Sequence, residues 1–227
     1  MVERFPGEFV TWRHTTPVGI KVDEVFGMDN KSGKVWIELA RQIYCEQGEP
    51  NYRVIEHFES GAPFLEGYPG RISITHTSHF FCVASLPKTP EVDLAVFSPR
   101  AALGVDAEPL DRNQVLKIRS KFLSEKELSS IPEENLPENI LAWTSKEALY
   151  KAALTPGLDF RNDIMIEKLP SLFMDSDDFS EHKLGNAIIK FPDSSGFGRK
   201  EMKLYSYESY GCCVTLAFSP KCAKFRK

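Results

Sequence analysis

The sequence predicts a mixed α+β fold, and two observations support this class. Segments typical of β-strands lie on both sides of a mainly helical middle, which extends from 113 to 155. In addition, 78–87 (SHFFCVASLP) resembles 209–220 (SYGCCVTLAFSP) when their Cys-Val pairs are aligned. Each of the two segments follows a further strand-like stretch, so the pattern is compatible with an internal duplication without requiring one.

The elements before the helical middle are predicted from local pattern. Apolar residues recur at helical spacing in 35–47, which indicates an amphipathic helix. The stretch 61–70 is rich in Gly and Pro and predicts turns. β-branched and aromatic residues predict a strand or hairpin over 71–87 and a second pair of strands over 94–109, interrupted by a Ser-Pro pair.

The rest of the chain returns from helix to strand. An acidic segment with two prolines, 131–139, interrupts the helical middle. Beyond it, 186–191 predicts a strand, 192–198 predicts a turn, and the segments MKLYSYES and CCVTLAF predict two more strands. We therefore expect the helices to lie between two groups of strands in the chain.

Composition excludes several classes of protein. With 42% hydrophobic and 26% charged residues, the chain is typical of a soluble globular protein. Its formal net charge of -4 argues against nucleic-acid binding, which requires a strong basic field. The five cysteines include no C-x-x-C pair, which favours reduced thiols over a disulfide framework or a zinc site. No apolar run suits a signal peptide or a membrane span, so we expect a cytoplasmic protein without membrane contact.

Two acids in the strand-like segment LGVDAEP (103–109) need a partner. Alternate side chains of an extended chain share a face, so Asp106 and Glu108 project together. Val105 and Ala107 project to the other side. Two carboxylates about 4 Å apart repel each other by roughly 4 kcal/mol at an effective dielectric constant of about 20. A proton, a basic side chain or a metal ion must therefore compensate their charge.

The helical segment 141–154 gathers further charged groups on one face, roughly 140° wide. The side chains on this face are Trp143, Lys146, Glu147, Tyr150 and Lys151. One interpretation is a solvated rim in which Glu147 and Lys151 form an i,i+4 ion pair. A second interpretation joins this face with the two acids of the strand. Three carboxylates with neighbouring lysines suit a hard divalent cation that holds a polyphosphate.

Four motifs, in this order along the chain, resemble those of the 4′-phosphopantetheinyl transferase superfamily, which activates acyl and peptidyl carrier proteins. ISITHTS at 72–78 resembles the family's S-[IL]-S-H-S strand, and GVDAE at 104–108 its G-[IV]-D-x-E strand. KFLSEKEL at 121–128 resembles the F-[FS]-x-x-E element. WTSKEALYK at 143–151 resembles the W-x-x-K-E-A-x-x-K helix. The resemblance is therefore close over 71–151.

The resemblance also implies an architecture. Small members of the superfamily are much shorter and assemble as trimers, whereas the larger type is a pseudo-dimer of two halves in one chain. The enzyme that activates surfactin synthetase is of the larger type, and the length of this chain is similar to it. We therefore expect a monomer with two similar α/β halves, 1–102 and 103–227, related by pseudo-twofold symmetry. The second half would contain most of the metal-binding and catalytic motifs.

The reaction implied by the resemblance is Mg²⁺-dependent. It transfers the 4′-phosphopantetheine arm of coenzyme A to a serine of an acyl or peptidyl carrier protein and releases adenosine 3′,5′-bisphosphate. Asp106, Glu108 and Glu147 resemble the Mg²⁺ ligands, and the cation would bridge the pyrophosphate of coenzyme A. Such a cation would also compensate the repulsion between the two acids of the strand.

Further residues receive roles from the same resemblance. Lys146 and Lys151 are expected to contact phosphates, and Lys151 also to assist the transfer. His76 resembles the histidine that contacts the 3′-phosphate of coenzyme A, and Arg71 is a further basic candidate outside the motifs. Glu127 resembles the acid proposed as general base, which would deprotonate the carrier-protein serine directly or through water.

Other interpretations stay open. Ser124 and Glu127 have the spacing of a capping box, which would make Glu127 structural. Three carboxylates and two lysines would also suit a metal-dependent phosphodiesterase or pyrophosphatase, although a second acidic or histidine cluster for two metals is missing. A catalytically silent relative that binds coenzyme A or carrier proteins is a third alternative. The loss of a ligand would indicate it, and all three carboxylates and both lysines are present.

Overall fold

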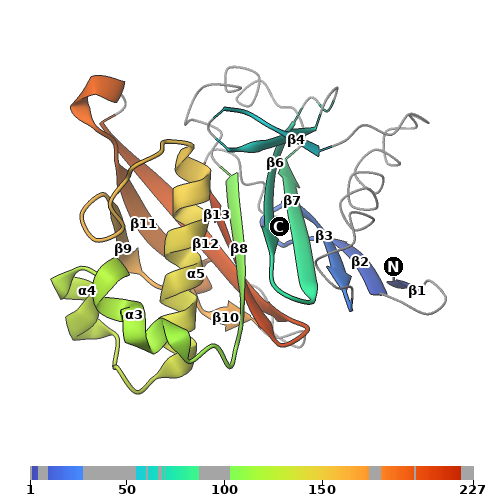
Figure 1. The fold of residues 1–227 in the computed structure, drawn as a ribbon, viewed down its shortest axis with the longest axis horizontal. Helices are drawn as coiled ribbons and strands as arrows, with labels where there is room; N and C mark the ends of the chain where they lie inside the picture. The colour runs from blue at the N-terminus through green and yellow to red at the C-terminus, as the bar shows by residue number, and fades with distance from the viewer. Residues whose placement is uncertain are drawn as a thin grey trace.

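The computed structural model describes residues 2–4, 10–27, 55–59, 61–65, 68, 70–86, 103–173, 180–196 and 198–220. These residues form two large β-sheets, a small two-stranded sheet and three α-helices (Figure 1). The predicted mixed α+β class is therefore confirmed. The helix predicted over 35–47 lies outside the described residues.

The first sheet has the strand order β1-β2-β3-β7-β6 and is antiparallel. Its strands are β1 (Val2–Arg4), β2 (Val10–Thr15), β3 (Lys21–Phe26), β6 (Arg71–His76) and β7 (Phe80–Leu86). β6 and β7 confirm the hairpin predicted over 71–87. A separate small sheet pairs β4 (Ile55–His57) with β5 (Pro63–Leu65). The prediction of turns alone over 61–70 is therefore wrong, because β4 supplies a pairing partner and Pro63 stands at the first position of the strand, where proline is tolerated.

The second sheet has the strand order β8-β13-β12-β11-β9, with β10 parallel to β12. Its strands are β8 (Leu103–Pro109), β9 (Ile164–Lys168), β10 (Leu172–Phe173), β11 (Gly185–Lys190), β12 (Arg199–Ser209) and β13 (Cys212–Phe218). The three strands predicted in the tail are confirmed by β11, β12 and β13. Of the pair of strands predicted over 94–109, only β8 falls within the described residues.

Three helices separate β8 from β9 in the chain: α3 (Gln114–Phe122), α4 (Glu125–Ser130) and α5 (Leu136–Ala153). Two short 3₁₀ turns, Glu181–Lys183 and Asp193–Ser195, follow later. The segment 131–139 does interrupt the helices, although α5 begins within it: Asn135 caps the helix by accepting from the Glu138 N–H at 3.3 Å. In the part of the chain that the structure describes, no helix has the length and apolar character needed to cross a membrane.

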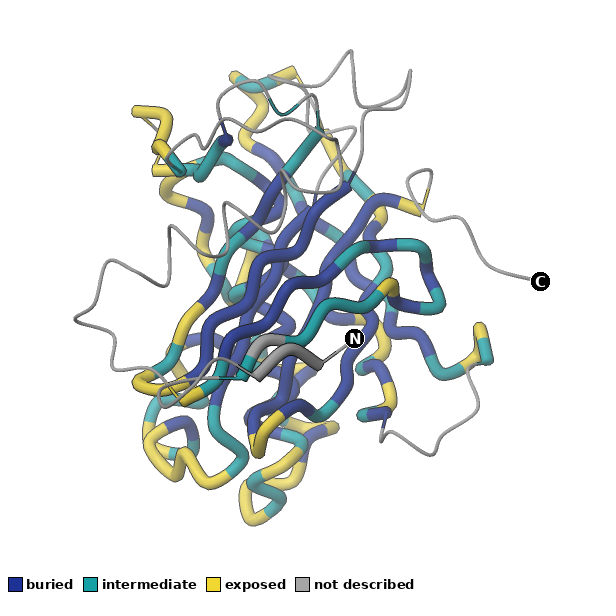
Figure 2. Tube along the Cα trace, turned by 90° about the vertical axis from the view of Figure 1, so that its right-hand side faces the viewer, coloured by how far each residue is buried: buried dark blue, intermediate teal, exposed yellow. Residues whose placement is uncertain are grey.

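The molecule is layered, with α5 on one face of the second sheet and the first sheet against the other face (Figure 1). The strands that cross the middle of the molecule are mostly buried (Figure 2). β8 shows the predicted alternation of side chains. Val105 and Ala107 join the core between the two sheets. Gly104 faces α5 so closely that an added Cβ would lie 1.9 Å from the carbonyl oxygen of Ala148. This glycine lets the strand with the two acids lie directly against the helix.

The two similar segments, 78–87 and 209–220, each contain the second strand of an antiparallel hairpin. β7 pairs with β6 in the first sheet, and β13 pairs with β12 in the second. A pseudo-twofold relation between two halves, 1–102 and 103–227, stays a prediction.

Candidate functional site

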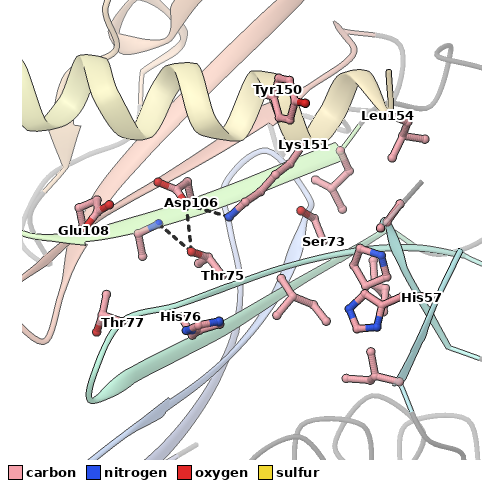
Figure 3. Close-up of a pocket in the computed structure, with 18 of the residues that line it drawn as sticks. His57, Ser73, Thr75, His76, Thr77, Asp106, Glu108, Tyr150, Lys151 and Leu154 are labelled. Atoms are coloured by element: carbon pink, nitrogen blue, oxygen red, sulfur yellow. Dashed lines mark hydrogen bonds and ion pairs between the residues drawn. The ribbon is translucent and has the colours of Figure 1, made fainter. Parts of the chain in front are cut away.

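A pocket of about 1000 Å³ opens where β6, β8 and the carboxyl end of α5 meet the small sheet of β4 and β5. Asp106, Glu108 and Lys151 lie on one side, and His57 and His76 come from the other (Figure 3). The pocket is polar around the two acids of β8 and more apolar toward the small sheet. It lies between the two large sheets because β6 and β8 are their facing edge strands.

The edges of β6 and β8 are joined by side-chain hydroxyl groups, which we call the hydroxyl seam (Ser73 and Thr75). Ser73 Oγ accepts a hydrogen bond from the Val105 N–H at 3.0 Å, and Thr75 Oγ1 accepts one from the Ala107 N–H at 3.2 Å. In the described sheets the two strands belong to separate ladders. The seam therefore satisfies backbone donors of β8 that would otherwise be buried without an acceptor.

Asp106 is held by groups from both sides of the pocket. Thr75 Oγ1 donates to Asp106 Oδ1 at 3.1 Å, and Lys151 Nζ lies 2.8 Å from the same oxygen (Figure 3). Lys151 Nζ also donates to the Val105 carbonyl at 3.1 Å. Burial raises the pKa of Asp106 despite the neighbouring Lys151. The second oxygen, Oδ2, is buried and has no hydrogen-bond partner among the described residues.

Glu108 is paired differently. The guanidinium of Arg112 forms an ion pair with Glu108 Oε1, and Trp143 Nε1 donates to the same oxygen at 2.9 Å. Trp143 therefore links α5 to the acidic face of β8 through its indole N–H, as well as packing against Phe122 and Phe160.

Glu147 completes the group of predicted carboxylates. Its pKa is raised to about 7, mainly by burial and then by the negative charge of Asp106 and Glu108, whereas Lys151 opposes the shift. Both acids of β8 therefore act on Glu147. Even so, within the described ranges no three His, Cys, Asp or Glu side chains are grouped closely enough to hold a metal ion. Two of the three carboxylates instead have cationic side chains as partners.

Lys146 is not among the described residues that line the pocket, and its expected phosphate contact stays a prediction. It is fully buried, and its Nζ lies 2.8 Å from Glu127 and donates to the carbonyls of Phe160, at 2.8 Å, and of Ile164. Burial lowers the pKa of Lys146, and Glu127 opposes that shift. All three protons of the ammonium group have acceptors, so no donor is left for a ligand.

Glu127 makes the contacts of the capping box with Ser124, which was the alternative to its role as a general base. Its Oε2 accepts from the Ser124 N–H at 2.7 Å and from Ser124 Oγ at 2.9 Å, and the capping box of α4 is complete. Its Oε1 accepts from the Ile166 N–H at 2.7 Å. This carboxylate is 4% exposed, is bound by several donors and does not line the pocket of Asp106, and its role as a general base stays a prediction.

The two basic candidates on β6, His76 and Arg71, differ in their position relative to the pocket. His76 lines the pocket and stacks on Phe81, with 5.8 Å between the ring centroids. Arg71, at the opposite end of the strand, is not among the described residues that line the pocket. Burial lowers the pKa of Arg71 to about 10. The arrangement thus supports a ligand role for His76 more directly than for Arg71.

Two basic residues of the pocket, His57 and Arg112, were not predicted from the sequence. His57 belongs to β4, a strand of three residues that has too few positions for a recognisable pattern. Arg112 follows β8 in the turn before α3. The i,i+4 spacing from Glu108 to Arg112 was visible, but it suggests contact only in a helix, and here a strand and a turn connect the two.

The assembled features define an α+β protein with carboxylates and cationic side chains over a large pocket, which is suited to a ligand with phosphate groups. Residues 102–193 match the model of the family described as the 4′-phosphopantetheinyl transferase superfamily. This match supports the assignment to that superfamily and suggests a transferase. The matched segment includes Asp106, Glu108, Glu147 and Lys151, whereas His76 lies before it. A comparison with curated proteins found no match.

Proposed function

We propose that the protein transfers the 4′-phosphopantetheine arm of coenzyme A to a serine of an acyl or peptidyl carrier protein, releasing adenosine 3′,5′-bisphosphate. The observation that supports this proposal is that Asp106, Glu108 and Lys151 line a large pocket and lie inside the segment that matches the superfamily. A monomer of the larger, pseudo-dimeric type in the cytoplasm is part of the same proposal.

Mg²⁺ fits the chemistry of these side chains. The buried Asp106 Oδ2 lacks a hydrogen-bond partner among the described residues, and a carboxylate oxygen of this kind is the ligand that Mg²⁺ prefers. Glu147, whose pKa is raised by burial and by the other two acids, would gain a positive partner. Asp106, Glu108 and Glu147 would hold the cation, which when bound offsets the charge on the phosphoryl oxygens.

The chain's own residues bind and orient the substrates. The side chain of Lys151 is 30% exposed, so its ammonium group can exchange Asp106 for a phosphate oxygen of coenzyme A. His76 supplies a ring nitrogen to an anionic group on the opposite wall. The serine oxygen of the carrier protein loses its proton to water and forms a bond to the β-phosphorus, while the bond between that phosphorus and the bridging oxygen breaks and adenosine 3′,5′-bisphosphate leaves with the electron pair. Charge stabilisation in such transfers contributes more than covalent chemistry by the protein.

The test is the intact mass of an apo acyl carrier protein after incubation with this protein, coenzyme A and Mg²⁺. We expect a gain of one phosphopantetheine arm with the wild type and with Glu201→Ala, a variant at an exposed position of β12. No gain is expected with Asp106→Ala. A gain of mass with Asp106→Ala would support the proposed reaction but contradict the role of Asp106 as a metal ligand.

Two other outcomes would support the alternatives. Absence of any gain with several apo carrier proteins, together with measurable binding of coenzyme A, would indicate a catalytically silent relative. Breakdown of coenzyme A without modification of a carrier protein would indicate a phosphodiesterase or pyrophosphatase. Both results would contradict the proposed transferase.

A further inference from the structure

We propose that Arg112 is an anion-binding residue that changes partners: it pairs with Glu108 in the ligand-free protein and turns to a phosphate group of the substrate when a divalent cation engages the carboxylates. This inference rests on the proposed function and adds a residue outside the four motifs. It also predicts that the cation and the phosphate-bearing substrate bind cooperatively, and that the side chain of Arg112 couples the two binding events.

The position of Arg112 allows the exchange. Arg112 lines the pocket in the turn between β8 and α3, and its side chain is 42% exposed, whereas that of Glu108 is 11% exposed. An ion pair with so exposed a cation is weak and open to competition. The planar guanidinium presents several N–H donors in a fork that matches phosphate as well as carboxylate.

Glu108 does not depend on Arg112 for its orientation. Trp143 Nε1 donates to the same Oε1 at 2.9 Å from the rigid helix α5. When Arg112 leaves, the carboxylate therefore keeps one directed hydrogen bond. The two donors thus have different roles: Trp143 fixes Glu108, and Arg112 neutralises it until another cation does so.

Charge pairing in the pocket explains why the exchange requires a cation. Of the described residues that line the pocket, Asp106 and Glu108 are the acids and Lys151 and Arg112 are the lysine and arginine. Lys151 pairs with Asp106, and Arg112 pairs with Glu108. A polyanion therefore meets cations that are already neutralised. A divalent cation on the carboxylates frees both, and such coupling works equally in both directions.

The experiment is isothermal titration calorimetry with Mn²⁺ alone, with coenzyme A alone and with coenzyme A in saturating Mn²⁺. The variant is Arg112→Gln, and its matched control is Lys117→Gln, which removes one positive charge from an exposed position of α3. We expect Arg112→Gln to bind Mn²⁺ alone several-fold more tightly. In Mn²⁺ it should bind coenzyme A roughly tenfold more weakly, as for the loss of one charge-assisted contact. Lys117→Gln should match the wild type.

Arg112→Lys refines the test, because it keeps the charge and loses the fork. We expect it to bind coenzyme A with an affinity between those of the wild type and Arg112→Gln. If Arg112→Gln instead weakens Mn²⁺ binding and leaves coenzyme A unchanged, Arg112 only orients Glu108 and the inference is wrong. The inference is also wrong if Arg112→Gln behaves like Lys117→Gln.

The failure of the inference can be distinguished from that of the proposed function. A wild-type protein that modifies a carrier protein, but whose Arg112 variants bind as the wild type does, would keep the function and remove the inference. A wild-type protein that binds neither Mn²⁺ nor coenzyme A and modifies no carrier protein would overturn both.

Discussion

Lys146 and Glu147 are neighbours in the chain, yet their side chains serve different parts of the molecule. Lys146 is fully enclosed with Glu127, which belongs to α4. Glu147 responds to the charges of Asp106 and Glu108 on β8. Two successive residues of a helix point about 100° apart, which is enough to separate a structural ion pair from a site.

Replacing Lys146 by Met should strongly destabilise the fold. The change removes the cation and leaves the buried Glu127 carboxylate unpaired, so we expect the free energy of unfolding to fall by about 3–5 kcal/mol. Urea denaturation monitored by circular dichroism measures this loss. The double variant Lys146→Met/Glu127→Gln should lose less than the sum of the two single variants, because they share one interaction. Additive losses would contradict the structural role.

Glu147 should make stability depend on pH in the absence of divalent cations. Its pKa rises from an ordinary 4.5 to about 7 in the folded protein, mainly through burial. Between these values the folded protein holds more protons than the unfolded chain, so the free energy of unfolding should fall as pH rises from 4.5 to about 7. Glu147→Gln should reduce this slope, measured by urea denaturation with a chelator present.

The control for the pH experiment is Glu201→Gln, at an exposed position of β12. It should retain the slope of the wild type. Asp106, whose pKa is also raised, should leave a residual slope in Glu147→Gln. Equal slopes in Glu147→Gln and Glu201→Gln would show that Glu147 does not titrate in this range.

At the scale of residues, the sequence predicted that Asp106 and Glu108 share a face. It did not predict that only one of the two lysines, Lys151, pairs with Asp106. Alternation along β8 was sufficient to bring Asp106 and Glu108 to one face, because a strand of this kind has a period of two. The helical face of α5 was too wide, at roughly 140°, for the same inference. Lys146 and Lys151 stand at the two margins of this face and therefore point in different directions. Lys146 pairs with Glu127, and Lys151 pairs with Asp106.

At the scale of elements, the site depends on the close contact between β8 and α5. The two acids stand on β8, and Trp143 and Lys151, which bind them, stand on α5. Gly104 allows the close approach of the two elements. A Cβ at Gly104 would lie 1.9 Å from the Ala148 oxygen and 2.7 Å from the Ala152 nitrogen. Both are backbone atoms of the helix, so a side chain cannot be accommodated by a change of rotamer.

Gly104→Ala should therefore separate the strand from the helix. We expect a loss of about 3 kcal/mol or more in the free energy of unfolding, seen as a lower thermal unfolding midpoint. Gly211→Ala is the matched control, since its Cβ would meet open space and only its φ of +73° resists the change. That control should cost about 1 kcal/mol. A similar loss in both variants would contradict the packing argument.

Buried polar side chains make some strands of the first sheet hard to predict from the sequence. β3 contains Asp23 and Glu24 within a buried strand, which weakens the local hydrophobic pattern. Arg13 of β2 pairs with Asp23 at 2.5 Å, and Tyr207 of β12 donates to Glu24 at 2.7 Å. Such compensation is visible only after folding. The hairpin 71–87 needed no distant partner and was predicted from its composition.

At the scale of the whole molecule, polar contacts join the two large sheets beside the apolar core. Glu24, on β3, is fully buried and accepts hydrogen bonds at 2.7 Å from Tyr207 and from Ser209, both on β12. The hydroxyl seam of Ser73 and Thr75 joins the sheets at the pocket. Buried polar contacts of this kind restrict how the sheets can be placed relative to each other.

Thr75→Val should weaken this junction with almost no change in shape. Valine leaves the Ala107 N–H without its acceptor and Asp106 without one donor, so we expect a loss of about 1–3 kcal/mol in the free energy of unfolding. Thr75→Ser keeps the hydroxyl group and should stay much closer to the wild type. Chemical denaturation of the three proteins tests this. Equal stability of Thr75→Val and the wild type would show that the seam contributes nothing.

The seam also covers part of the backbone edge of β8. β8 is the terminal strand of the described second sheet, and an open strand edge with apolar side chains is a template for pairing with another chain. Ser73 and Thr75 occupy backbone donors along this edge with side chains, which cannot extend into a further strand. A fragment that begins at Leu103 would lose this cover. The first sheet thus covers the edge of β8 and hinders its pairing with a strand of another chain.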